Sequence, residues 1–224
     1  MGLSAYFRLA RAGFILAREG ALSLADNDAL PPVMQAGVRF GRLFERRDVR
    51  SSGRAERLSR ALHRLGPTYV KIGQTLATRP DIVGTQIAAD LAVLQDKMDP
   101  FDPALVPGML KEALGDKAAA LTDLSPPIAA ASIAQVHKAT LTNEDGRWTV
   151  AVKLLRPDIQ QRFRADIESQ YAGARLAEAL VPRLRRLRPV EVVQILDRSA
   201  RLELDLRMEA AAISEMADNI KADT

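Results

Sequence analysis

The sequence predicts an α+β fold, in which a mainly helical N-terminal part is followed by a small antiparallel sheet and further long helices. Apolar residues recur at helical spacing through the first half of the chain, most clearly at Leu58, Leu62, Leu65, Tyr69, Ile72 and Leu76. After Ser125-Pro126-Pro127 the pattern changes to β-prone runs separated by Asp145-Gly146, a dipeptide typical of hairpin turns. We therefore divide the chain into residues 1–50, 51–125 and 126–224.

Prolines and glycines set the expected limits of the helices in the first half. Residues 1 to about 30 predict one or two short helices that end at Pro31-Pro32, and residues 33–50 predict a basic helical piece. A long amphipathic helix is expected from Ser52, interrupted at Pro67 and ended by residues 80–84. Two further helices are expected over residues 86–97 and from Asp102-Pro103 to Gly115.

The second half predicts strands over residues 128–156, a helix over 157–181 and one long final helix from 190 to about 220. Between the two helices lies a basic connector that contains Arg183, Arg185, Arg186 and Arg188. We expect this connector to be a solvated loop, with anionic lipid headgroups as the alternative partner.

The N-terminus predicts an amphipathic surface helix. Its apolar residues, among them Leu3, Phe7 and Phe14, are interrupted by arginines, which is not the layout of a signal peptide. No apolar run in the sequence is long enough to span a bilayer.

The composition argues against several classes of function. Aromatic residues make up 4% of the chain, which argues against a nucleic-acid binder that stacks bases on aromatic side chains. Cysteine is absent and there are 2 histidines, so we expect no disulfide and no thiolate or histidine metal site. The net charge of +4 fits a surface that meets nucleotide or anionic lipid.

The strongest functional signal is the segment from Ala129 to Val136 followed by Val150-Ala151-Val152-Lys153. Protein kinases begin with Gly-x-Gly-x-x-Gly-x-Val, a hairpin and then Val-Ala-x-Lys. Ala129, Ala131 and Ala134 stand at the glycine positions, and Lys153 stands at the strand lysine. Because alanine restricts the backbone more than glycine does, we expect an altered nucleotide preference and altered handling of the γ-phosphate.

Two more motifs complete the set: Lys71-Ile72-Gly73-Gln74 in the first half, and Glu203-Leu204-Asp205 with Glu209 near the end. Together with the alanine-rich segment and Lys153, they resemble the UbiB family of atypical kinase-like proteins, also called ABC1 or ADCK, over residues 52–219. The resemblance implies a kinase-like N-lobe and a helical extension laid over its nucleotide site. It also implies ATPase or small-molecule kinase chemistry that supports ubiquinone biosynthesis beside a membrane.

The resemblance implies roles for individual residues in the lobe. Lys153 would contact the α- and β-phosphates and pair with Glu209, whose alternative is a solvated carboxylate. Val136 and Ala151 would sandwich the adenine, although both also fit a plain strand core. The alanine-rich loop would face phosphate through the Ser132 side chain and the backbone amides of the loop, which contains Ala129, Ala130, Ala131 and Ala134.

The extension has its own implied residues. Lys71 and Gln74 would project into the site, and Lys71 would pair with Glu203, with Asp205 completing that motif. Glu203 and Glu209 are expected on one helix, offset so that they serve different lysines. From the Lys71 residue alone an ordinary exposed lysine is the favoured interpretation, but the neighbouring Gly73 shifts the balance to the packed alternative.

The sequence contains no catalytic-loop Asp and Asn pattern and no Asp-Phe-Gly. We expect ATP or ADP with Mg²⁺ as the cofactor, no metal ligands in this chain, and no turnover by the chain alone. Whether it is an enzyme stays open, and we favour a piece of a longer protein over a naturally short form.

The expected partners are nucleotide, ubiquinone-pathway lipids or proteins and an anionic membrane surface, but no nucleic acid. The expected location is the cytoplasmic face of a membrane. The alternative is a lipid-binding or regulatory scaffold built on a degenerate kinase lobe.

Overall fold

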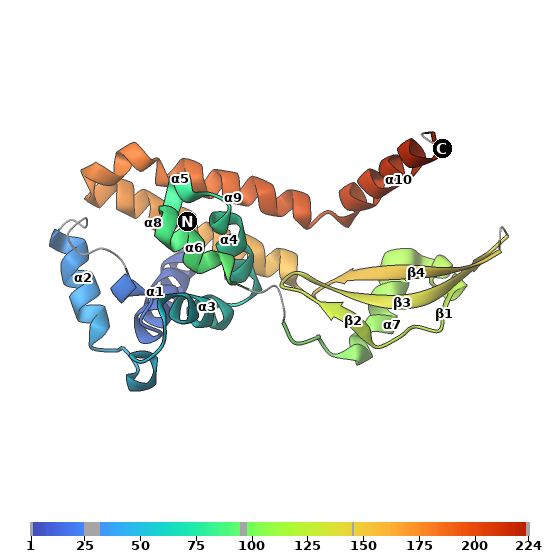
Figure 1. Cartoon of the computed structure of the whole chain (residues 1–224), viewed down its shortest axis with the longest axis horizontal. Helices are drawn as coiled ribbons and strands as arrows, with labels where there is room; N and C mark the ends of the chain where they lie inside the picture. The colour runs from blue at the N-terminus through green and yellow to red at the C-terminus, as the bar shows by residue number, and fades with distance from the viewer. Residues whose placement is uncertain (1, 25–31, 95–97, 145, 223–224) are drawn as a thin grey trace.

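The computed structural model describes residues 2–24, 32–94, 98–144 and 146–222. The predicted features at Pro31, over residues 95–97 and at Asp145 lie outside these ranges, as does the Arg183 side chain. The α+β fold is confirmed: a helical body lies at one end of the molecule and a small sheet at the other (Figure 1).

The helical body begins with elements that follow one another closely. They are α1 (Leu3–Arg18), η1 (Leu22–Leu24), α2 (Pro32–Arg42), η3 (Arg47–Val49), α3 (Arg54–Leu65), α4 (Pro67–Ala77), α5 (Pro80–Val83) and α6 (Thr85–Ala92). The predicted break at Pro67 is confirmed, because Gly66 ends α3 with a φ of 111° and Pro67 opens α4. The next helix, predicted over 86–97, ends earlier, at Ala92.

The sheet is antiparallel and has β3 at its centre. After η4 (Pro103–Leu105), α7 (Val106–Leu114) and η5 (Gly115–Ala120) come β1 (Leu121–Thr122), β2 (Pro127–Ala130), β3 (Ala134–Asn143) and β4 (Gly146–Leu155). The two long strands pair from Ala134 with Leu155 to Asn143 with Gly146, while β1 and β2 pair with different stretches of β3. One face is covered by α7, through a core cluster of Val106, Leu110 and Leu154.

The long helices α8 (Ile159–Leu180) and α9 (Pro189–Glu203), joined by η6 (Pro182–Leu187), pack mainly on the helical body, and their core cluster also includes Ile133 and Ala134 at the loop end of the sheet. Their main core cluster joins Phe163, Ile167 and Leu196 to Ile72 of α4. Packing therefore crosses the predicted divisions of the chain. Helices α8 and α9 belong to residues 126–224 but pack on α4 of residues 51–125, and α7 belongs to residues 51–125 but covers the sheet of residues 126–224. The domain boundaries themselves stay a prediction.

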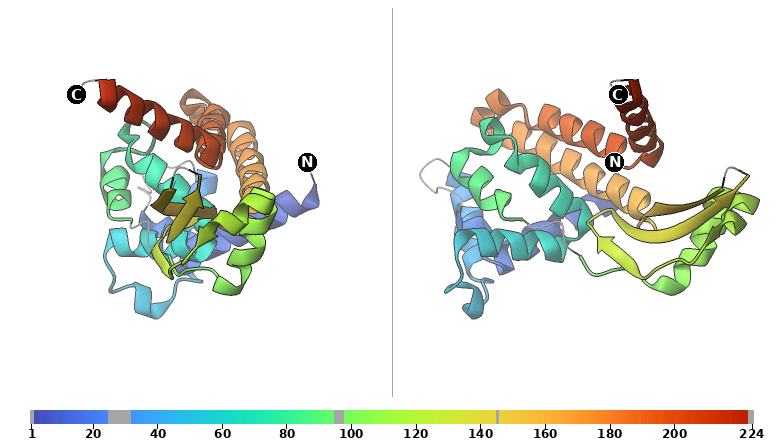
Figure 2. Two further views of the ribbon diagram at one scale, coloured as in Figure 1. Left: turned by 90° about the vertical axis from the view of Figure 1, so that its right-hand side faces the viewer. Right: turned by 45° about the vertical axis from the view of Figure 1, so that its right-hand side comes forward.

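The expectation of one long final helix is wrong. The structure has two helices, α9 and α10 (Leu206–Ala222), with a break at Leu204 and Asp205. The Asp205 side chain accepts a hydrogen bond from the backbone N–H of Arg207 at 3.2 Å, which caps the first turn of α10. Leu204 is buried, so the chain turns inward at the break. Helices α10 and α7 lie on opposite sides of the sheet (Figure 2).

Candidate nucleotide-binding site

The open face of the sheet carries four of the predicted site residues. Val136 pairs directly with Lys153 and with Ala129, and Ala151 pairs with Lys138. Residues directly opposite in an antiparallel pair lie on the same face, and side chains alternate along each strand. Because Val152 and Leu154 point toward α7, this set points the other way, toward the side on which α10 lies.

Lys153 forms an ion pair with Glu209 of α10. The Lys153 Nζ atom lies 2.6 Å from Glu209 Oε2 and 2.8 Å from Oε1. Both side chains are about half exposed, so solvent screens the pair and its contribution to stability is small. The pair holds the ammonium group of Lys153 over the open face and connects α10 to the sheet.

A second ion pair joins Lys71 of α4 to Glu203, the last residue of α9. The close packing expected at Gly73 is present: a Cβ there would lie 2.7 Å from Leu62 Cδ1 and 2.8 Å from Leu94 Cδ2. Because this close packing fixes the position of α4, it also sets the direction in which the Lys71 side chain extends from the helix. Gln74 is partly buried on the next turn.

The two ion pairs lie on either side of the α9–α10 break. The prediction that Glu203 and Glu209 share one helix is therefore wrong, because Asp205 starts a new helix between them. The Asp205 carboxylate also accepts from the Arg207 guanidinium at 2.8 Å, and this hydrogen bond holds the pKa of Asp205 below its usual range. The carboxylate is thus ionised and keeps its capping role at neutral pH.

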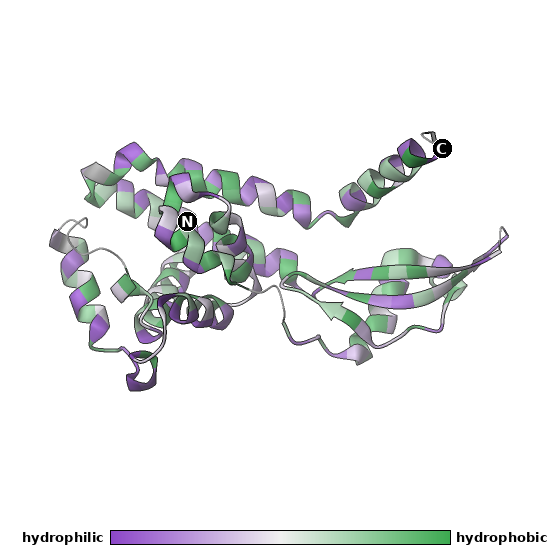
Figure 3. Ribbon diagram, in the orientation of Figure 1, coloured by the Kyte–Doolittle hydropathy of each residue, from purple (hydrophilic) through white to green (hydrophobic). Residues whose placement is uncertain are grey.

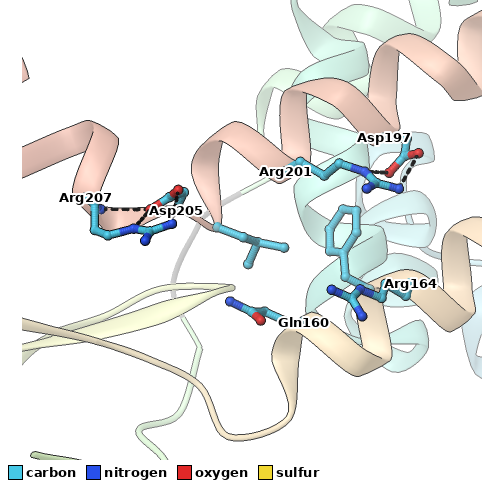
Figure 4. Close-up of a pocket in the computed structure, with 8 residues that line it drawn as sticks. Gln160, Arg164, Asp197, Arg201, Asp205 and Arg207 are labelled. Carbon is cyan, nitrogen blue, oxygen red and sulfur yellow. Dashed lines mark hydrogen bonds and ion pairs between the residues drawn. The ribbon is translucent and has the colours of Figure 1, made fainter. Parts of the chain in front are cut away.

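A cavity of about 300 Å³ opens at the same break (Figure 4). Its polar lining comes from Gln160, Arg164, Asp197, Arg201, Asp205 and Arg207. Arg201 donates to Asp197 at 2.8 Å, so two of the arginines are each held by an aspartate. Sequence reasoning named Asp205 alone of this group, although the i, i+4 spacing of Asp197 and Arg201 was a usable signal.

The alanine-rich loop (residues 129–134) forms a tight turn between β2 and β3. The N–H of Ala131 donates to the carbonyl of Ala134 at 2.8 Å, and Ala130 is still part of β2. The structure differs from the prediction at Ser132, whose side chain is fully buried and does not face an open phosphate site. Arg156, which the sequence did not single out, donates from Nε to the Ala131 carbonyl at 2.9 Å.

The described residues do not form a magnesium site. Across residues 2–24, 32–94, 98–144 and 146–222, no three His, Asp or Glu side chains gather to hold a metal. The Asp205 and Glu209 carboxylates, on either side of the first residues of α10, are already held by Arg207 and Lys153. Within the same ranges, no helix is both long and apolar enough to cross a membrane.

A family model described as the ABC1 atypical kinase-like domain matches residues 93–224. The chain belongs to the ABC1 family. Its matched part contains the sheet, the alanine-rich loop and helices α8 to α10, whereas Lys71 lies ahead of it.

Relatives with the name "Probable protein kinase UbiB" resemble this ABC1 chain. That of Vibrio cholerae serotype O1 (strain M66-2) is 42% identical over 168 residues, which is 74% of this chain and 30% of the relative. That of Edwardsiella ictaluri (strain 93-146) is 44% identical over 169 residues, 75% of this chain and 31% of the relative. That of Aliivibrio fischeri (strain MJ11) is 41% identical over 168 residues, again 74% and 30%. The chain thus spans about a third of the length of the curated relatives it matches.

Proposed function

We propose that this chain supplies the nucleotide-binding lobe and helical extension of an atypical kinase-like ATPase that supports ubiquinone biosynthesis. The observation that carries the proposal is the Lys153–Glu209 ion pair, with Nζ and Oε2 2.6 Å apart on the open face of the sheet. In kinases, a strand lysine that is paired with a helix glutamate binds the phosphates of the nucleotide.

In this proposal Lys153 engages the α- and β-phosphates, and Val136 and Ala151 contact the adenine from the same face of the sheet. Glu209 keeps the lysine oriented between turnovers. The Lys71–Glu203 pair fastens the extension to the end of α9, with Gln74 and Asp205 beside it, on the side where a peptide substrate would otherwise lie. Bound Mg²⁺ would neutralise charge on the phosphates, and its ligands would come from outside the described residues.

The test is nucleotide affinity in the intact protein that contains this chain. We expect Lys153→Ala to weaken ATP and ADP binding roughly tenfold or more, because hydrogen bonds between charged groups contribute about 1.5–3 kcal/mol. Lys111→Ala is the matched control, since Lys111 is an exposed lysine on α7, across the sheet from the site. Unchanged affinity in the Lys153 variant would refute the proposal.

A second candidate function, a lipid-binding scaffold, is favoured by exposed apolar residues on α1, on α2 and in the turn after α2, which we call the exposed apolar patch. The patch consists of Leu3, Phe7, Phe14, Phe40, Leu43 and Phe44. Positions 3, 7 and 14 fall on one face of α1, and the Phe14 and Phe44 rings touch edge to face with centroids 5.8 Å apart. Exposed apolar patches of this kind mark interaction surfaces, and the surrounding arginines suit an anionic bilayer.

A larger cavity supports the same candidate. It has a volume of about 720 Å³, lies between α4, α8 and α9, and is lined mainly by apolar side chains such as Ile72, Leu76 and Leu196. Arg186 and Arg188 of the basic connector also line it, together with Glu191, whose Oε2 atom accepts from Arg188 at 3.2 Å. An apolar cavity bordered by guanidinium groups suits a molecule with an acyl or prenyl chain and an anionic head.

Flotation with anionic and zwitterionic vesicles tests this candidate. We expect Phe7→Ser with Phe40→Ser to abolish flotation with the anionic vesicles, whereas Trp148→Ser, which removes another exposed aromatic side chain from the distal hairpin, leaves it unchanged. Binding that nucleotide does not alter would favour the scaffold function. The absence of binding to either vesicle would remove it.

A further inference from the structure

Residues 98–101 connect the helical body to the lobe and run along the sheet beside the alanine-rich loop. The N–H of Met98 donates to the carbonyl of Ala130 at 3.2 Å, extending the pairing of β2. The N–H of Phe101 donates to the Oε1 atom of Gln135 at 3.1 Å. The chain leaving the extension is therefore hydrogen-bonded to both strands that flank the loop.

Arg156, at the end of β4, binds the loop and this connecting segment together. Its backbone N–H donates to the Ile133 carbonyl and its Nε to the Ala131 carbonyl, both at 2.9 Å. Its Nη2 donates to the Asp99 carbonyl at 2.8 Å. A guanidinium is a rigid planar fork, so one side chain sets the distance between the two backbones.

A buried polar network provides a second connection at the same place. His137 Nδ1 lies 2.8 Å from the Ser125 carbonyl, which can only accept, so Nδ1 carries the proton. His137 Nε2 then accepts from the Gln135 amide at 2.9 Å, which leaves Gln135 Oε1 free to receive the Phe101 N–H. Gln135 and His137 are 0% and 2% exposed, so losing any link would leave a polar group unpaired in the interior.

The carbonyls that Arg156 binds determine where the loop amides point. In a trans peptide the C=O and the following N–H point in opposite directions. Holding the Ala131 and Ile133 carbonyls toward Arg156 therefore directs the N–H groups of Ser132 and Ala134 away from it, into the turn between β2 and β3, where these two residues are 0% and 2% exposed. Arg156 therefore fixes the conformation of the turn that joins β2 to β3.

We propose that Arg156 is a positioning residue of the nucleotide site, and that it couples the alanine-rich loop to residues 98–101 and so to the extension. It acts through the conformation of the loop, which joins the strands that carry Ala129 and Val136 of the open face, and does not touch the nucleotide itself. The part of this inference that concerns affinity rests on the proposed function. The mechanical coupling of the two segments does not.

The experiment compares Arg156→Gln and Arg156→Lys with Arg147→Ala in the intact protein. Arg147 is the matched control, because it lies at the distal start of β4, the strand that Arg156 directly follows, and is exposed and paired with Asp123. Amide hydrogen exchange of residues 98–101 and 131–134 is measured without nucleotide, and nucleotide affinity is measured separately. Melting curves identify any variant that has lost its fold.

We expect both Arg156 variants to speed exchange in the two segments together by roughly tenfold or more, with the middle of the β3–β4 pair unchanged. Nucleotide affinity should fall roughly tenfold in both, because lysine keeps the charge but cannot hold two carbonyls in one fork. Arg147→Ala should change neither readout. If Arg156→Gln does not fold, Gln135→Met replaces it and should loosen both segments by releasing Phe101.

Faster exchange in only one segment, or in neither, would overturn the coupling. Restored affinity in Arg156→Lys would overturn the positioning role, since it would mean that the charge attracts phosphate directly. A wild-type protein that binds no nucleotide would refute the proposed function alone, and the exchange data would then decide the coupling.

Discussion

Two carboxyl groups on the helical body have pKa values displaced in opposite directions. Burial raises the pKa of Asp166 on α8, against the opposing charges of Arg11 and of Arg8, whose Nη1 atom lies 3.5 Å from Asp166 Oδ1. The Arg79 guanidinium, 2.7 Å from Asp81, holds the pKa of that exposed carboxyl below its usual range. The two residues therefore contribute to stability in opposite ways as the pH changes.

We predict that Asp166→Asn stabilises the protein at neutral pH. A raised folded-state pKa means that the wild-type carboxyl favours folding below its unfolded value of 3.8 and loses that contribution as the pH rises through the raised value. The asparagine carries no such penalty, so its advantage should appear at neutral pH and vanish in acid. Urea denaturation midpoints measured across this pH range give the comparison.

Asp81→Asn is the control with the opposite sign. Because the pKa of Asp81 is lowered, its stabilising effect is present above 3.8 and is lost as the pH falls. This variant should be slightly less stable than the wild type at neutral pH and equal to it in acid. If both variants changed stability in the same direction, burial would not be the cause at Asp166.

Single residues also explain why only part of the candidate site was visible in the sequence. Lys153, Glu209, Lys71 and Glu203 belong to motifs, and the structure brings each lysine to the glutamate named for it. The contacts of Arg156 are to backbone carbonyls, which every residue has, so no spacing of side-chain types predicts them.

At the scale of elements, α4 owes its position to the absence of a side chain at Gly73. We predict that Gly73→Ala destabilises the protein by about 1–3 kcal/mol, the usual cost of overpacking a core. The added Cβ would lie 2.7 Å and 2.8 Å from the ends of Leu62 and Leu94, both buried and unable to move aside freely. Thermal or urea unfolding measures the change.

Gly37→Ala is the matched substitution, because Gly37 lies inside α2 with no heavy atom within 4 Å of the added Cβ. Alanine there should stabilise the protein by roughly 0.5–1 kcal/mol through helix propensity. Equal effects at the two positions would contradict the packing argument. The Gly73 variant should also weaken the Lys71–Glu203 pair, since any shift of α4 moves the lysine.

The elements also show where sequence patterns stop being informative. Residues 190–220 contain no proline or glycine, so nothing in their propensities predicted a break. The break comes from the Asp205 cap and from the burial of Leu204, and burial is set by the rest of the fold. Periodicity likewise revealed that α8 and α9 have apolar faces, but it could not tell that those faces pack mainly on α4 and meet the sheet at its loop end.

At the scale of the whole molecule, α10 is connected mainly through its first turns. Residues 207–221 are all exposed, among them the apolar Met208, Ile213, Met216 and Ile220. Apolar and polar residues alternate along this helix as it projects from the molecule (Figure 3). The orientation of α10 relative to the sheet therefore depends on the Lys153–Glu209 pair and on the turn at Asp205.

We predict that Glu209→Gln widens the range of orientations that α10 adopts. The chain contains no cysteine, so spin labels at Trp148→Cys on the hairpin and Ile213→Cys on α10 report one distance without further changes. Electron paramagnetic resonance should give a broader distance distribution in Glu209→Gln than in the labelled parent. Salt at about 1 M should broaden the parent as well, because the Debye length falls to about 3 Å and the pair is half exposed.

Glu215→Gln, which alters an exposed carboxylate farther along α10, is the control and should leave the distribution unchanged. Equal widths in all samples would mean that the Asp205 turn alone fixes α10, and the ion pair would then orient the lysine without holding the helix.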